Sequence, residues 1–71
     1  MEARYTAELV AVYRLAFDAE GRSRFFDTVE VRNRKSGAVV AQFLVESSDD
    51  TEPYNRAVSE MIGTPSFEWI G

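Results

Sequence analysis

The sequence predicts a small α+β domain: a three-stranded antiparallel meander, then one helix packed on one face of the sheet, with room for a short C-terminal strand (β-β-β-α-β). Two patterns support this fold class. Side chains alternate with a period of two over much of the chain, and an amphipathic segment follows an acidic loop. The 71 residues have the length of one domain, which we assign to 1–71.

The first strand is predicted over residues 5–17, where every odd position is apolar. These residues are Tyr5, Ala7, Leu9, Ala11, Tyr13, Leu15 and Phe17, while Thr6, Glu8, Arg14 and Asp18 fall on even positions. Successive side chains of a strand point to opposite faces, so the apolar set lies on one face.

Two further strands follow, each preceded by a turn. The polar segment 18–23 contains Gly21 and has the length of a hairpin connection. Residues 24–34 are rich in β-branched and aromatic side chains and form the second strand. Residues 35–37 form a tight turn, and 38–46 form the third strand.

One alignment of these strands satisfies both faces of the sheet. It places Phe17 opposite Phe25, Tyr13 opposite Val29, Ala11 opposite Val31, Glu8 opposite Arg34 and Asp18 opposite Arg24. Between the second and third strands it pairs Val31 with Ala41 and Val29 with Phe43. A slip by one residue would turn every core side chain to the wrong face.

Asp27 does not fit this alignment, because it falls among the core-facing positions. An unpaired buried carboxylate is costly. We therefore expect a bulge at Phe25–Phe26, or a strand-end position, to turn Asp27 outward. A functional buried acid is the alternative.

The helix is predicted to follow the loop 47–53 and to run to about Ile62, with Asp50 or Thr51 as its cap and Gly63 as its stop. Its apolar face is Tyr54, Ala57, Val58, Met61 and Ile62, and it should cover Tyr5, Leu9, Tyr13, Val29, Val31, Val39, Phe43 and Val45. The three tyrosines are therefore assigned to the core. Residues 64–71 alternate again and can add the short fourth strand.

The composition excludes several kinds of chemistry. The chain has no cysteine and no histidine, which removes thiolate nucleophiles, soft-metal sites and imidazole bases. We expect no enzyme activity, no cofactor and no metal. No run approaches the roughly 18 apolar residues of a membrane span, so the cytoplasm is the expected location.

The second face of the sheet carries the candidate interface. Its middle is apolar, with Val10, Val12, Phe26, Val40 and Leu44, and Trp69 near the C-terminus is a candidate anchor that can alternatively close the core edge. Exposed apolar clusters of this kind often mark interfaces, although strands favour valine in any case. We expect a homodimer, formed face to face or through an edge strand.

Charge patterning suggests two further surfaces. The acids Glu46, Asp49, Asp50 and Glu52 form a candidate contact patch for a basic partner, with helix capping and Ca²⁺ or Mg²⁺ binding as alternatives. The bases Arg14, Arg22, Arg24, Arg32, Arg34 and Lys35, with Phe26 for stacking, could instead bind nucleic acid. The net charge of −4 argues against that second use.

Together these features predict a non-enzymatic protein–protein interaction module that occupies a partner macromolecule, as small acidic inhibitors, antitoxins and phage-encoded host-takeover proteins do. The alternative is a small nucleic-acid-binding module that uses the sheet and its arginines. The predicted β-β-β-α-β order is similar to that of HicB-like antitoxin domains, in topology alone, and topology does not set function.

Overall fold

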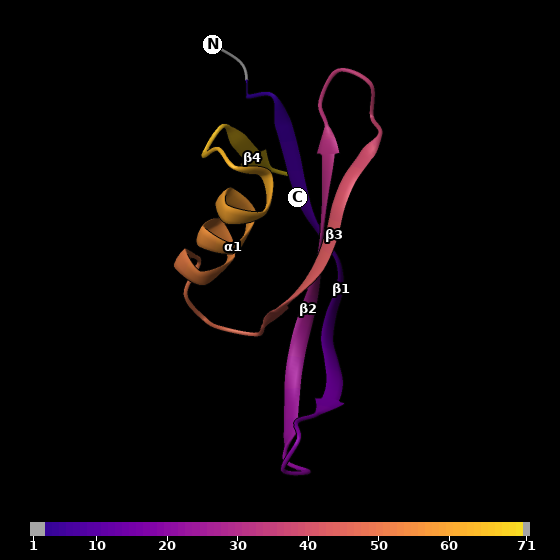
Figure 1. The fold of residues 1–71 in the computed structure, drawn as a ribbon, viewed down its shortest axis with the longest axis vertical. Helices are drawn as coiled ribbons and strands as arrows, with labels where there is room; N and C mark the ends of the chain where they lie inside the picture. The colour runs from indigo at the N-terminus through magenta and orange to yellow at the C-terminus, as the bar shows by residue number, and fades with distance from the viewer. Residues whose placement is uncertain (1–2, 71) are drawn as a thin grey trace.

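The computed structural model describes residues 3–70 and confirms the α+β class (Figure 1). Its elements are β1 (Tyr5–Phe17), β2 (Ser23–Asn33), β3 (Val39–Glu46), α1 (Glu52–Ile62) and β4 (Phe67–Trp69). They form one sheet in the order β3-β2-β1-β4, in which β1, β2 and β3 are an antiparallel meander and β4 runs parallel to β1. The short C-terminal strand that the alternating side chains predicted is therefore confirmed as β4.

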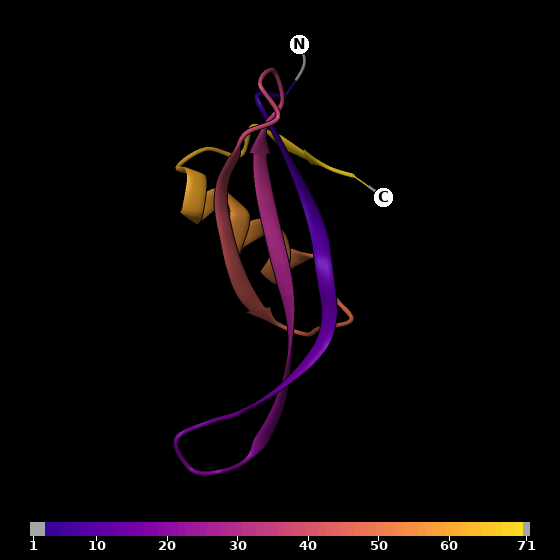
Figure 2. The same ribbon diagram turned by 90° about the vertical axis from the view of Figure 1, so that its right-hand side faces the viewer.

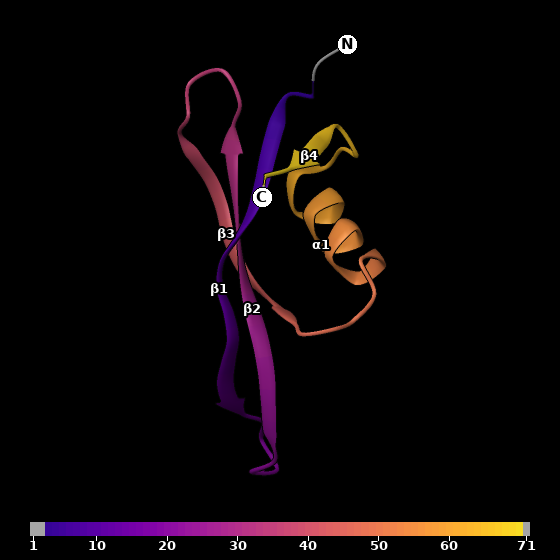
Figure 3. The ribbon, with the colours of Figure 1, turned by 180° about the vertical axis from the view of Figure 1, so that it is seen from behind.

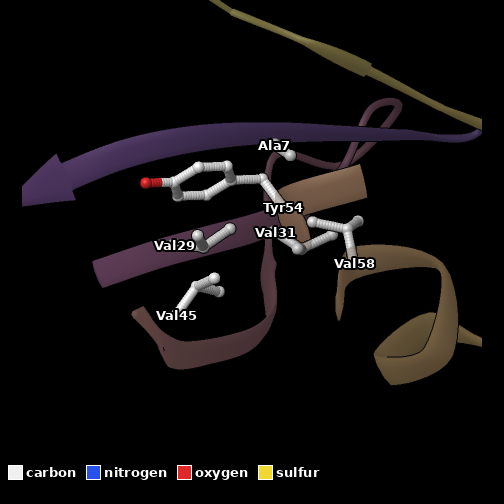
Figure 4. Close-up of a cluster of buried hydrophobic side chains, with 6 residues drawn as sticks. All are labelled: Ala7, Val29, Val31, Val45, Tyr54 and Val58. Carbon is white, nitrogen blue, oxygen red and sulfur yellow. The ribbon is translucent and has the colours of Figure 1, made fainter. Parts of the chain in front are cut away.

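The core lies between α1 and the half of the sheet that is uppermost in Figure 1. Six buried side chains form it: Ala7, Val29, Val31, Val45, Tyr54 and Val58 (Figure 4). The ring of Tyr54 and the side chain of Val58 come from α1, and the other four come from β1, β2 and β3. A helix of 11 residues is too short to be stable alone, so this contact with the sheet holds it in place.

The ends of α1 follow the predicted pattern only in part. Thr51 occupies the N-cap position, but no side-chain capping hydrogen bond forms there within the described chain. Gly63 ends the helix with a φ of 74°, and its N–H donates to the Ser59 carbonyl at 2.9 Å. Only a residue without a Cβ adopts this left-handed conformation at no steric cost. Met61, assigned to the buried face, is exposed.

The predicted register is right for one strand pair and wrong for the other. Val31 faces Ala41 and Val29 faces Phe43, as the sequence predicted for β2 and β3. Between β1 and β2, however, the structure pairs Phe17 with Ser23, Leu15 with Phe25, Leu9 with Val29, Ala7 with Val31 and Glu8 with Glu30. Arg24 still forms an ion pair with Asp18, at 3.2 Å, although the two residues are not directly opposite.

Two causes account for this difference. At the arm end the pairs are already offset by two positions, with Phe17 facing Ser23 instead of Phe25, because the β1–β2 turn is centred one residue earlier than predicted. Two irregularities in β1 add the rest. The register shifts once between Leu9 and Ala11 and again between Ala11 and Arg14, so β1 carries two more residues than β2 over this stretch. Each extra residue moves the pairing by one position. The alternation in the sequence continues across both shifts, and therefore does not reveal them.

The β1–β2 hairpin extends well past the rest of the molecule. We call residues 13–26 the arm. The pairing of β3 with β2 ends at Glu46, opposite Phe26, and one further hydrogen bond joins Ser47 N–H to the Phe25 carbonyl at 2.9 Å. Figures 2 and 3 show that the arm continues beyond both α1 and β3. The molecule is therefore elongated, with extents of 44 × 21 × 21 Å.

Candidate functional site

The carboxylate of Asp27 is buried at the point where the arm joins the core. Its side chain is 4% exposed, so the expectation that a bulge turns it outward is wrong. The irregularity lies in β1 instead, where Tyr13 has a φ of 53°. Asp27 Oδ1 accepts the Tyr13 backbone N–H at 2.9 Å, and Oδ2 accepts the Tyr54 hydroxyl at 2.5 Å. The buried acid therefore pairs with donors from β1 and α1.

These hydrogen bonds decide the charge state of Asp27. Burial by itself raises the pKa of its carboxyl group, but bonds from the Tyr54 hydroxyl and the Tyr13 N–H, together with the nearby Ser47 hydroxyl, leave the pKa below its ordinary value. The Ser47 hydroxyl lowers this pKa through its proximity to the carboxylate. Within residues 3–70, its buried Oγ has no hydrogen-bond partner at normal geometry. Burial, followed by the bond to Asp27, raises the pKa of Tyr54. Asp27 is thus an anion and Tyr54 a neutral donor near pH 7.

An open pocket of about 260 Å³ lies beside this pair. It is lined by Leu9, Val12, Tyr13, Asp27, Ser48, Asp49, Asp50, Thr51, Tyr54 and Trp69. These residues come from β1, β2, the loop between β3 and α1, the start of α1, and β4. In Figure 4 the Tyr54 hydroxyl points along the sheet toward the arrowhead of β1, which is the arm end.

Hydrogen bonds hold the pocket walls in place. Trp69 Nε1 donates to Asn55 Oδ1 on α1 at 2.6 Å. The Tyr54 hydroxyl accepts the Ser48 N–H at 2.8 Å in addition to donating to Asp27. The Asp50 N–H donates to Ser48 Oγ at 3.1 Å, which orders the acidic loop. Two of the aromatic walls, Tyr54 and Trp69, and the loop are therefore held in place before any ligand binds.

The arm carries the two most exposed large apolar side chains of the described chain, Tyr13 and Phe17, and two others that are more than half exposed. Tyr13 is 70% exposed, Leu15 54%, Phe17 69% and Phe25 51%. Leu15 faces Phe25 directly, and Phe25 shares a face of β2 with the inward-facing Asp27 and Val29. We call Tyr13, Leu15, Phe17 and Phe25 the arm face. The expectation that Tyr13 lies in the core is wrong, because its side chain is largely exposed and lines the open pocket.

The predicted interface residues separate into two groups. Val10, Val40 and Leu44 are exposed, and Phe26 is half-buried. Val12 and Trp69 are exposed as well, but they line the pocket on the helix side. The part of the second face around Glu30 is polar, since Glu30 pairs with Arg32 at 2.7 Å and accepts a hydrogen bond from Gln42 at 3.0 Å.

The acidic residues also separate. Glu46 pairs with Arg24 at 2.9 Å and Glu52 with Arg56 at 3.1 Å, whereas Asp49 and Asp50 line the pocket. Over residues 3–70, no three acidic side chains come together as a cluster that could hold a metal ion. The candidate contact patch is therefore reduced to the two aspartates at the pocket.

The basic residues do not form one patch. Arg22, Arg24, Arg32 and Arg34 each form an ion pair with an acid, namely Glu20, Glu46, Glu30 and Glu68 respectively. Arg14 lies in the arm and Lys35 in the turn between β2 and β3, at opposite ends of the sheet. The positive charge that nucleic-acid binding requires is thus dispersed and largely compensated.

Comparisons with protein-family models, with curated proteins and with solved structures find no match to this chain. In the part of the chain that the structure describes, no helix has the length and apolar character needed to cross a membrane. The functional argument therefore depends on the pocket and the arm face themselves.

The sequence contains one signal that could have revealed the arm face. The first strand has 13 residues, the third has 8, and α1 has 11 residues, or about 16 Å at 1.5 Å per residue. Neither β3 nor α1 can cover the whole of β1. Apolar residues near the far end of β1 and the start of β2 must therefore lie outside the core.

Proposed function

We propose that this protein is a non-enzymatic interaction module that forms a homodimer through the arm face and occupies a partner protein at the acidic pocket. The single observation that carries the proposal is the arm face itself, whose four large apolar side chains are all more than half exposed. Contiguous apolar surface of this kind on a small protein favours contact with another chain.

The total surface area supports a second copy as the occupant of the arm face. A folded chain of 8.0 kDa exposes about 4,500 Å² by the usual scaling with mass. This chain exposes 5170 Å². The excess, about 700 Å², is close to the roughly 800 Å² that each partner buries in a standard interface.

The arm geometry is suited to a two-fold contact. Leu15 and Phe25 form a directly opposed pair, flanked by Phe17 toward the tip and Tyr13 toward the pocket. In a symmetric dimer the same patch meets itself, so a compact apolar face on a protruding hairpin can pack against its own copy. The acids at the pocket and the net charge of −4 would remain available to attract a basic partner surface.

Light scattering at high micromolar concentration tests the dimer. We expect twice the 8.0 kDa monomer mass for the native chain and the monomer mass for L15S/F25S. The matched control is V40S/L44S, which removes apolar area from the second face and should stay dimeric. A monomeric native chain would contradict the proposal. Loss of the dimer in V40S/L44S alone would place the interface on the second face instead.

A further inference from the structure

We propose that the pocket beside Asp27 binds the guanidinium group of an arginine side chain on a partner protein. This inference rests on the proposed interaction function and names the chemistry of the group that the pocket recognises. Three features support it: the charge of the lining, its aromatic walls and its size.

The charge of the lining is negative and uncompensated. Asp27, Asp49 and Asp50 all line the pocket, and no lysine or arginine is among the lining residues in the described chain. Four of the chain's arginines, Arg22, Arg24, Arg32 and Arg56, pair with acids outside this pocket. Asp49 and Asp50 form no ion pair with any residue in the range 3–70. The pocket therefore presents a field that favours a cation.

The walls favour a planar cation on an apolar stem. Three aromatic residues, Tyr13, Tyr54 and Trp69, line the pocket, and Leu9 and Val12 add aliphatic surface. A guanidinium group stacks on aromatic rings, donates to carboxylates through two N–H groups at once, and is more weakly hydrated than an ammonium group. The aliphatic residues suit the methylene groups of an arginine side chain.

The size and rigidity of the pocket point to one side chain rather than a separate small molecule. Its volume of about 260 Å³ lies below the range of about 300–1,000 Å³ that is usual for small-molecule sites. The Trp69–Asn55 and Tyr54–Ser48 hydrogen bonds already fix the walls, so binding needs little reordering. Tyr13 belongs both to the pocket and to the arm face, which places the site next to the proposed dimer contact.

The chain has one tryptophan, and it lines the pocket. The indole N–H resonance of Trp69 in a ¹H–¹⁵N spectrum of the full chain therefore reports binding directly. The probe is the blocked tripeptide acetyl-Ala-Arg-Ala-amide, and its neutral match replaces arginine with citrulline. We expect a saturable shift with the arginine peptide and at least about tenfold weaker binding of the citrulline peptide, because a charge-assisted hydrogen bond is lost.

Variants test the assigned acids. D49N/D50N should weaken binding of the arginine peptide by about tenfold, while E60Q, an acid-to-amide change on the exposed side of α1, should leave it unchanged. Equal binding of the two peptides, or no saturable shift at millimolar peptide, would overturn the proposal, as would an unchanged affinity in D49N/D50N. Tighter binding of free arginine or spermidine than of the peptide would also overturn it, because the ligand would then be a free small cation.

The outcome is separable from that of the proposed dimer. Light scattering reports the arm face, and the Trp69 resonance reports the pocket. If the chain is dimeric but does not bind the arginine peptide, only the arginine site is refuted. If the chain is monomeric and binds the peptide, only the dimer is refuted.

Discussion

The Asp27 carboxylate accepts the backbone N–H of Tyr13 at 2.9 Å, and this bond joins the buried acid to the irregular part of β1. In a regular antiparallel pair, a backbone N–H finds its acceptor on the neighbouring strand or in solvent. At an inserted residue that partner is lost. Asp27 supplies the missing acceptor, which explains why an ionised side chain is retained at a core-facing position.

Removal of the Asp27 carboxylate should destabilise the protein. In D27A the Tyr13 N–H loses its acceptor and the Tyr54 hydroxyl loses its strongest one. We expect the free energy of unfolding to fall by about 2–3 kcal/mol, as measured by urea denaturation. D49A, at the exposed part of the same pocket, should change it by less than about 0.5 kcal/mol. Similar effects of the two variants would show that Asp27 has no special structural role.

The same hydrogen bonds predict how stability depends on pH. The pKa of Asp27 is lower in the folded state than in the unfolded chain. Near and below the ordinary aspartate pKa of about 3.9, the unfolded chain therefore binds more protons than the folded chain. This part of the stability is present above that pH and is lost as the pH falls through the folded pKa. Urea denaturation at a series of acidic pH values should therefore show a steeper loss in the native chain than in D27N. Parallel curves would contradict this account.

The pKa of Tyr54 produces the opposite dependence at alkaline pH. The folded state raises it above the ordinary value of about 10, so the associated stability is complete below pH 10 and is lost as the pH rises through the folded pKa. Y54F lacks the titrating hydroxyl and should lose less stability over this range. Urea denaturation above pH 9 compares the two chains. An equal alkaline loss would assign the effect to other groups.

The left-handed backbone at Tyr13 predicts an order among substitutions there. Its φ of 53° is unfavourable for side chains branched at Cβ and is tolerated better by asparagine. Because the Tyr13 side chain is 70% exposed, little packing is lost on replacement. We expect Y13V to be less stable than Y13N by about 1 kcal/mol in thermal or urea unfolding. If valine matched asparagine, β1 would not hold the left-handed turn in solution.

Val58 provides a test of how α1 is attached to the sheet. Its side chain is fully buried against the core residues of β1, β2 and β3. V58A should cost about 2 kcal/mol of unfolding free energy through lost burial and the cavity that remains. M61A, on the same helix but exposed, should cost less than about 0.5 kcal/mol. Comparable losses would mean that α1 packs on the sheet through a different face.

The sequence by itself determined the elements of this protein. The alternation of side chains defined the three long strands, and helical spacing and Gly63 defined the end of α1. The pairs Val31–Ala41 and Val29–Phe43 were also predicted correctly, although the β2–β3 register shifts between Val31 and Arg32. These features depend on residues close together in the chain. Local backbone preferences and the period of the apolar pattern are therefore enough to predict them.

Only the tertiary structure decided the β1–β2 register, the burial of Asp27 and the exposure of the arm face. The register beyond the arm, the burial and the exposure depend on where β1 takes up its two extra residues and on how far α1 reaches along the sheet. Both are set by contacts between distant residues, such as Tyr13 with Asp27 and Asp27 with Tyr54. Alternation shows on which face of the sheet a side chain lies, but it does not show what packs against that face. An apolar residue at an odd position therefore gives the same pattern whether or not a helix covers it.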